Sequence, residues 1–161
     1  MASKGYSRKE VADKLGITGR TVWFYTEKEL VAPDVANPKG KGATRLYSAK
    51  NIVEVAVCRK LGEHGLRLEL IRDILRTGRS AKPKDGFDPW DPVKASATER
   101  RRFFLLIYDP AGEHPAVIPT GLQPGQELYV TDQWGTRRNR FEVCIALDLS
   151  AICDQVREAL A

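Results

Sequence analysis

Cysteine and histidine are scarce in this 161-residue chain, which has three of the first and two of the second. Cys58, Cys144 and Cys153 are odd in number and include no C-x-x-C pair, so neither a disulfide framework nor a four-ligand zinc site is indicated. His64 and His114 stand apart from any carboxylate or cysteine pattern that would make a general base or a metal ligand. We therefore expect reduced thiols, no metal, no cofactor and no enzymatic activity.

Long apolar runs are also absent. The longest strongly apolar stretch covers residues 103–108, far short of the roughly 20 residues that span a bilayer. No N-terminal segment resembles a signal peptide. With 42% hydrophobic residues, the chain can bury one modest core or two small ones. We expect a soluble, cytoplasmic protein that has no membrane partner.

Acidic residues are in short supply in the first half of the chain. Residues 1–80 hold 16 Lys and Arg against 9 Asp and Glu, a net charge of +7, whereas residues 81–161 hold 10 against 12, a net charge of −2. A positive field confined to one part of a chain is expected where that part meets a polyanion such as nucleic acid. A solvated, slightly basic surface gives the same count, so charge alone leaves both interpretations open.

Two short helices joined by a tight turn are predicted near the N-terminus. Ser7 and Glu10 have the spacing of a capping box at the start of the first helix, and Gly16 can adopt positive φ at its end. Thr18 caps the second helix, over residues 17–25. Val22 and Tyr25 are expected to face inward, with Phe24 as a further candidate for that face; the outward residues are Arg20, Thr21 and Trp23. This pattern is typical of a helix-turn-helix, whose second helix enters the major groove of DNA by its N-terminal end.

A basic, glycine-containing loop follows the second helix. Residues 38–42 are predicted to form the tip of a β-hairpin, with Lys39 and Lys41 exposed to solvent or phosphate, because residues 45–47 alternate like a strand. A hairpin directly after a helix-turn-helix is a wing. Ser48 then caps a longer helix that continues to Gly62, and residues 66–78 form another helix that we expect to stop at Gly78.

In this order, residues 6–76 resemble the winged-helix DNA-binding domain of the MerR family of bacterial transcription regulators. The segments that carry the resemblance are residues 7–16, 17–25, 30–33, 45–48 and 65–71. The resemblance implies a homodimer on a pseudopalindromic promoter, with the recognition helix in the major groove, the wing on flanking phosphates, and regulation by bending or untwisting the spacer. The residues expected to contact DNA are Ser7, Arg8, Thr18, Arg20, Thr21, Trp23, Phe24, Lys39, Lys41, Arg45 and Tyr47.

Three positions depart from the family pattern. Trp23 stands where the family usually has arginine, Glu29 where it usually has glycine, and the wing loop over residues 39–42 is longer than usual. An exposed Trp23 can stack on a sugar or contact a thymine methyl group, whereas its alternative is ordinary packing against the wing. The operator sequence therefore need not resemble that of familiar members.

The second half of the chain is predicted to be a linker and a small module. Residues 80–100 are rich in proline and break regular structure, with Trp90 expected to pin part of them to a flanking domain. The long dimerising helix of well-known family members is missing here. In residues 101–161 we expect antiparallel strands followed by a terminal helix capped by Ser150; the strand segments are 103–108, 115–119, 128–130 and 141–149. Such a module buries little surface alone, so self-association would help it.

Two basic clusters lie in this second half. Arg137, Arg138 and Arg140 fall in the polar connection between the last two predicted strands, and residues 100–102 are three consecutive arginines. Each cluster has three interpretations: an anion site, an extension of the DNA footprint, or charges that keep an exposed edge soluble.

The fold class predicted is therefore a mainly α winged helix-turn-helix domain over residues 1–79, a proline-rich linker over 80–100 and a small α+β dimerisation or sensor module over 101–161. The first functional hypothesis is a sequence-specific regulator that binds double-stranded DNA as a homodimer, with contact to RNA polymerase and a small-molecule effector as further partners left open. The second is an excisionase-like or architectural DNA-binding factor whose C-terminal module recruits a protein. A protein-interaction module without a DNA role is the third. The sequence does not distinguish activation from repression.

Overall fold

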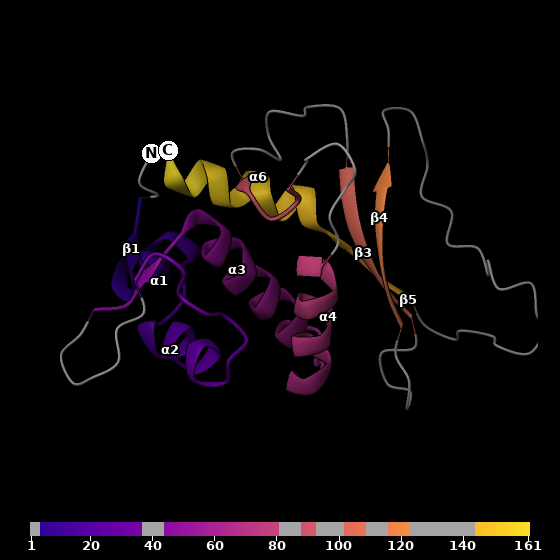
Figure 1. Ribbon diagram of the computed structural model, residues 1–161, viewed down its shortest axis with the longest axis horizontal. Coiled ribbons are helices and arrows are strands. Elements are labelled where there is room, and N and C mark those ends of the chain that lie inside the picture. Colours follow the sequence, from indigo (N-terminus) through magenta and orange to yellow (C-terminus); the bar gives the residue numbers. More distant parts are fainter. Residues whose placement is uncertain (1–3, 37–43, 81–87, 93–101, 109–115, 123–143) are drawn as a thin grey trace, which may run out of the picture.

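The computed structural model describes residues 4–36, 44–80, 88–92, 102–108, 116–122 and 144–161. Among these described residues, the first 80 positions contribute four helices and a two-stranded pairing, and the last 60 contribute a three-stranded sheet and one helix (Figure 1). The three-stranded sheet lies beside the fourth helix, at the opposite end of the molecule from the two-stranded pairing (Figure 1). A helical N-terminal part followed by a small antiparallel sheet and a terminal helix agrees with the predicted fold class, whereas the predicted domain bounds and the role of the second module stay predictions.

The first helix, α1 (Arg8–Leu15), begins with the predicted capping box. The backbone N–H of Ser7 donates to Glu10 Oε2 at 2.7 Å, and the N–H of Glu10 donates to Ser7 Oγ at 3.3 Å. Gly16 follows with φ of 61°, and its neighbour Ile17 donates back to the carbonyl of Ala12 at 3.0 Å. This is the left-handed termination that glycine permits, so both ends of α1 are confirmed.

Helix α2 (Gly19–Glu27) starts at Thr18, whose hydroxyl accepts from the N–H of Thr21 at 3.2 Å. It ends in the same left-handed manner as α1, but here the residue with positive φ is Glu29, at 57°. The N–H of Leu30 reaches back to the carbonyl of Tyr25 at 2.9 Å and closes the turn. Position 29, where the family usually has glycine, thus keeps a backbone conformation that glycine would adopt more easily.

The wing has its predicted strand and an additional pairing. Strand β2 (Leu46–Tyr47) pairs antiparallel with β1 (Tyr6–Ser7), which was not predicted. On its other side Leu46 exchanges backbone hydrogen bonds with Ala36, at 3.2 Å and 2.7 Å, so the chain before and after the loop runs antiparallel. The predicted hairpin tip, with Lys39 and Lys41, lies outside the described residues.

Helix α3 (Ala49–Glu63) begins at Ser48, as predicted, and α4 (Leu68–Ser80) follows. The prediction that α4 stops at Gly78 is wrong, because the helix continues to Ser80 and Gly78 is buried within it. A Cβ atom at this position would lie 2.5 Å from Cζ2 of Trp90, so glycine here makes room for the indole ring. The expectation that Trp90 pins the proline-rich segment is confirmed, since the ring is only 4% exposed.

The second half contributes strands β3 (Arg102–Tyr108), β4 (Ala116–Leu122) and β5 (Cys144–Asp148), which are antiparallel in the order β4-β3-β5. The central strand aligns Leu105 with Pro119 on one side and with Leu147 on the other. The predicted strands near residues 103–108, 115–119 and 141–149 are therefore present over these bounds. The predicted strand 128–130 and the connection that carries Arg137, Arg138 and Arg140 lie outside the described residues.

Helix α6 (Leu149–Leu160) is the predicted terminal helix, but its cap differs from the prediction. Asp148 is the cap, and its Oδ1 accepts from the N–H of Ala151 at 3.0 Å. Ser150 lies inside the helix, where its hydroxyl accepts from the N–H of Phe103 at 2.8 Å and so ties α6 to β3. Both residue types favour helix starts, and the strand pairing decided between them.

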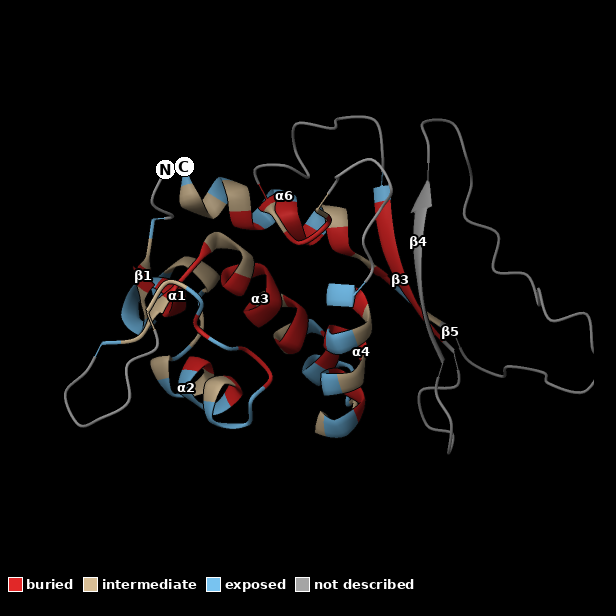
Figure 2. Ribbon diagram, in the orientation of Figure 1, coloured by how far each residue is buried: buried red, intermediate tan, exposed pale blue. Residues whose placement is uncertain are grey.

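Buried side chains from both halves of the chain form one continuous core. α6 lies across α3 and α1 (Figure 1), and its inner face joins the same cluster as the inner faces of α3 and α4 (Figure 2). Lys14 of α1 donates to the carbonyl of Ala159 in α6 at 2.7 Å. The surface that we expected self-association to cover is thus partly buried against the winged part of the same chain. Within the described ranges, no helix has the length and apolar character of a membrane span.

The strain at Glu29 gives a test of the turn after α2. Replacing Glu29 with glycine should raise the free energy of unfolding by about 1 kcal/mol, because a left-handed backbone costs that much for a residue with a Cβ. The side chain of Glu29 is exposed, so its removal disturbs little packing. Urea denaturation measures the change, and Gly16→Ala at φ of 61° is the control that should lose stability by a similar amount. A neutral or destabilising Glu29→Gly would contradict the assignment of strain.

Candidate nucleic-acid interface

The outer face of α2 exposes the residues predicted to read DNA. Arg20 is exposed, Trp23 is 44% exposed and Phe24 is 36% exposed, whereas Val22 and Tyr25 are buried. Trp23 and Phe24 are the large hydrophobic side chains that remain exposed in the described part of the chain. Two neighbouring exposed aromatic rings beside an arginine are typical of a contact surface, because isolated domains normally bury such side chains.

The N-terminal end of α2 faces the same surface. Thr18 and Thr21 share a hydrogen bond between their hydroxyl groups at 2.9 Å, which fixes the first turn of the helix. Arg8 is exposed at the start of α1 and lies next to this turn, since its Nε would be 3.7 Å from a Cβ atom at Gly19. A helix N-terminus with an adjacent guanidinium group favours an anion such as phosphate. Ser7, by contrast, uses its hydroxyl to cap α1.

The predicted wing residues have different environments. Arg45 Nη1 lies 2.6 Å from Glu27 Oε1, and the two side chains are 36% and 42% exposed, so Arg45 holds the wing against the last turn of α2 while remaining accessible. Tyr47 is only 1% exposed, and its hydroxyl lies 2.9 Å from that of Thr26. This burial leaves Tyr47 little surface for DNA and makes it a support between β2 and α2.

A set of buried polar residues behind this surface was missed from the sequence. Asn51 and Glu54 of α3 are 3% and 7% exposed, and Asn51 Nδ2 donates to Glu54 Oε2 at 3.0 Å. The other oxygen of Glu54 accepts from Arg79 Nε at 2.6 Å. Two polar side chains at inward positions of an apolar helix are the signal that the sequence offered, because buried polar groups require partners.

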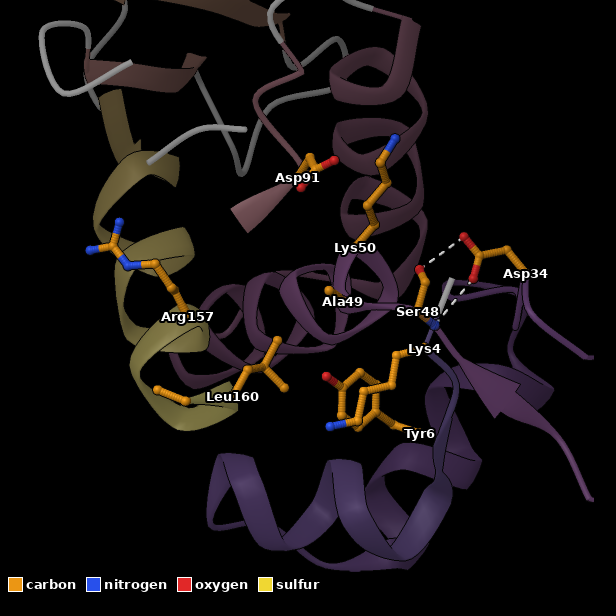
Figure 3. Close-up of a pocket in the computed structure, with 10 residues that line it drawn as sticks. Lys4, Tyr6, Asp34, Ser48, Ala49, Lys50, Asp91, Arg157 and Leu160 are labelled. Atoms are coloured by element: carbon orange, nitrogen blue, oxygen red, sulfur yellow. Dashed lines mark hydrogen bonds between the residues drawn. The ribbon is translucent and has the colours of Figure 1, made fainter. Parts of the chain in front are cut away.

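An open cleft of about 700 Å³ separates the wing from α6. Asp34 and Ser48 lie on one side and Arg157 and Leu160 of α6 on the other (Figure 3). Ser48 Oγ donates to Asp34 Oδ2 at 2.9 Å, and Lys50 is paired with Asp88. The hydrogen bond with Asp88 raises the pKa of Lys50, so the ammonium group of Lys50 stays protonated at neutral pH.

The two described thiols, those of Cys58 and Cys153, are buried in positions that suppress their reactivity. Burial raises the pKa of Cys58 to about 12 and that of Cys153 to about 12, and both are free. His64 is exposed at the end of α3. Over the ranges that the structure describes, no three His, Cys, Asp or Glu side chains gather as metal ligands do. His114 and the side chain of Cys144 lie outside those ranges.

Comparison with known proteins finds similarity in the first half of the chain. Residues 6–77 match the family described as MerR HTH family regulatory protein. The HTH-type transcriptional regulator CueR of Yersinia pestis is 38% identical over 66 residues, which are 41% of this chain and 45% of that protein. Uncharacterized HTH-type transcriptional regulators of Mycobacterium bovis and Mycobacterium tuberculosis are each 32% identical over 68 residues, 42% of this chain and 30% of theirs. The match thus spans less than half the length of each relative.

The support role of Tyr47 can be measured. Tyr47→Phe should lower the free energy of unfolding by about 1 kcal/mol, because it removes the hydrogen bond with Thr26 and leaves the ring in place. In a Thr26→Val background the same change should be nearly neutral, since the partner is already gone. Urea denaturation of the wild type, the two single variants and the double variant completes this double-mutant cycle. If Tyr47→Phe lowered the free energy of unfolding equally in both backgrounds, the hydrogen bond between the two hydroxyl groups would contribute nothing to stability.

Proposed function

Because this chain carries a helix-turn-helix domain of the MerR family in residues 6–77, we propose that it is a sequence-specific DNA-binding transcription regulator. The observation that carries the proposal is the outer face of α2, where Arg20 and two exposed aromatic rings lie on the helix that this domain type inserts into the major groove. The net charge of +7 over residues 1–80 supplies the attraction to phosphate that such binding requires.

In this proposal each group has a defined task. Arg20 donates to a base edge, with guanine O6 and N7 as its preferred bidentate partners, and Trp23 contacts a sugar or a thymine methyl group. Arg8, the first turn of α2 and Arg45 meet phosphates beside the groove, and Lys39 and Lys41 extend these contacts along the backbone. Base contacts then set the sequence preference, whereas phosphate contacts set affinity and register.

Two copies of the chain would occupy the two halves of a pseudopalindromic promoter site. Dimers of helix-turn-helix proteins place their recognition helices about 34 Å apart, one turn of DNA. The second half of the chain would supply the dimer contact and respond to a small molecule or protein, with RNA polymerase as the final partner in the cytoplasm. The activity proposed is binding and deformation of DNA, which requires no catalytic residue.

Selection of bound fragments from a genomic library tests the proposal. Paired half-sites within promoter spacers would support regulation by a dimer. Recovery of a single attachment locus would instead support the excisionase-like alternative, in which the second half recruits a protein. Failure to retain any DNA at low salt would reject both and favour a protein-interaction module.

Replacing Arg20 with alanine should reduce the preference for the selected site by about 1–3 kcal/mol relative to a scrambled site. Arg76→Gln is the matched control, since Arg76 is an exposed arginine on α4 that pairs with Asp73 and lies outside the proposed interface. Fluorescence anisotropy on both DNA duplexes measures the ratio of affinities. An unchanged ratio for Arg20→Ala would place the recognition face elsewhere.

Replacing Lys39 and Lys41 together with glutamine should weaken binding to both duplexes equally. Each phosphate that is no longer neutralised lowers the magnitude of the slope of log K against log salt by about 0.9, so the expected decrease is about 1.8. The ratio of affinities between the two duplexes should stay within about twofold, because phosphates carry no sequence information. A titration with KCl between the same limits for the wild type and the variant gives both numbers.

A further inference from the structure

Residues 30–34 connect the recognition helix to the wing, and polar side chains from α3 and α4 hold their backbone in place. Arg79 Nη2 donates to the carbonyl of Leu30 at 2.7 Å. Asn51 Nδ2 donates to the carbonyl of Ala32 at 3.1 Å, and Asn51 Oδ1 accepts from the N–H of Asp34 at 3.1 Å. The angle between α2 and the wing therefore depends on contacts from α3 and α4.

The wing side of this connection is held from the same place. Ser48 directs its N–H to Asp34 Oδ1 at 3.2 Å and to Asn51 Oδ1 at 3.3 Å, and its hydroxyl also bonds Asp34. We define the wing base as residues 34–36 and 45–48. Its backbone is thus linked through Asn51 to the connecting residues and, one step further, to Glu54.

Glu54 joins these contacts to α4. Its side chain is 9% exposed and lies between Asn51 and Arg79, which supply hydrogen bonds to its two oxygens. A buried carboxylate that loses one of its partners keeps a large desolvation penalty, so both contacts must form together. Arg79 is the branch point, because the same guanidinium group binds Glu54 and the carbonyl of Leu30.

The second half of the chain docks on α4 directly beside Arg79. Gly78 precedes Arg79 and lies under the ring of Trp90, with Leu105 of β3 also within 3.5 Å of a Cβ atom built at this glycine. The last turn of α4 therefore carries a hydrophobic contact to residues 88–92 on one face and the ionic contact to α3 on another. A shift of this turn moves both.

We propose that Arg79 and Glu54 are positioning residues for the wing, and that they make the position of the wing base depend on the docking of Trp90 against α4. The relay runs from Arg79 through Glu54 and Asn51 to Asp34 and Ser48. The relay rests on the proposed function only for its predicted effect on DNA binding. Its predicted effect on the position of the wing base can be measured in the free protein.

Amide hydrogen exchange of the free protein tests the relay without DNA. Arg79→Gln and the isosteric Glu54→Gln should each speed exchange by about tenfold at Ala36 and Leu46, whose amides each donate to the other residue's carbonyl across the wing base. Exchange at Ile17 and Thr21 in the turn between α1 and α2 should stay within about twofold of the wild type. Arg76→Gln, three residues away on the same helix, is the matched control and should change neither set.

Arg79→Lys separates positioning from general stability. Lysine keeps a positive charge for Glu54 but has a single head group, so it cannot bind Glu54 and Leu30 in the geometry of the planar guanidinium. Exchange at the wing base should fall between the wild type and Arg79→Gln. The proposal would be overturned if amide exchange at the wing base in Arg79→Gln and in Glu54→Gln equalled that in Arg76→Gln. A uniform rise in exchange across the whole protein would overturn it as well.

Gly78→Ala tests the link to the second half. Alanine favours the helix more than glycine does, so α4 itself is not weakened, but the new methyl group displaces Trp90. We expect the indole N–H signal of Trp90, assigned with Trp90→Phe, to shift and exchange at Ala36 and Leu46 to rise about threefold. A shifted Trp90 signal with unchanged exchange at the wing base would overturn the dependence on docking.

Salt titrations on a selected DNA site extend the test. Relative to Arg76→Gln, Arg79→Gln should lower the magnitude of the salt slope by about 0.9 for each phosphate that the wing no longer reaches, while the ratio of affinities for selected and scrambled sites stays within about twofold. A slope equal to that of the control would overturn the positioning role in DNA binding. Absence of binding by the wild type would reject the proposed function instead, and the exchange experiment would still decide the relay.

Discussion

The carboxylate of Glu54, buried near the middle of α3, is the constraint on which the rest of the winged part depends. A charge so placed is tolerated only when donors reach it from fixed directions. Arg79 arrives from α4 and Asn51 from the preceding turn of α3, and both also bind the backbone of residues 30–34. The packing of α3 against α4 and the path of the chain from the recognition helix to the wing are therefore fixed by the same group. Burial of apolar surface has no preferred direction, so these hydrogen bonds add a directional constraint to the apolar packing of α3 against α4.

The hydrophobic core of the second half of the chain is completed by buried side chains of the winged part. Helix α3 is apolar over most of its circumference, which is expected of a helix that is covered on more than one side. α4 covers one side and α6 another, so α3 lies at the centre of the molecule (Figure 2). The odd-numbered residues of β3, among them Leu105 and Ile107, add to the same cluster. A small sheet with one helix gains buried surface in this way that it would not have alone. The orientation of the recognition helix and the folding of the second half are consequently not independent.

Local sequence patterns correctly predicted the features that depend on contacts between residues close in the chain, such as the helix caps. The caps at Ser7, Thr18 and Ser48 each bond a backbone group three residues away, so the spacing alone identifies them. The end of α4 was predicted wrongly, because Gly78 is required by the ring of Trp90, which the local pattern does not contain. Serine and aspartate both favour the cap position. In the structure Asp148 caps α6, and the hydroxyl of Ser150 instead accepts a hydrogen bond from Phe103 of β3. At the candidate interface helical spacing placed Arg20 and Trp23 correctly on the outward face of α2, although Phe24, a candidate inward residue, is exposed. The burial of Tyr47 and the hydrogen bond between Glu54 and Arg79 depend on elements 21 and 25 residues distant. Spacing along the chain could not predict these.

The replacement of the usual arginine by Trp23 changes which residues of the proposed interface can supply the contacts to bases and phosphates. An indole ring has one donor and no charge, so it provides contact area and at most one hydrogen bond, where arginine would provide a bidentate contact and attraction to phosphate. The missing charge has to be supplied nearby, and Arg8 and Arg45 are accessible cations that flank α2. Arg45 belongs to the wing base, which in the proposed relay is held through Asp34 and Ser48. If α2 enters the groove as proposed, its aromatic residues would make DNA affinity more sensitive to the position of the wing, and the second half of the chain would then influence that affinity through α4.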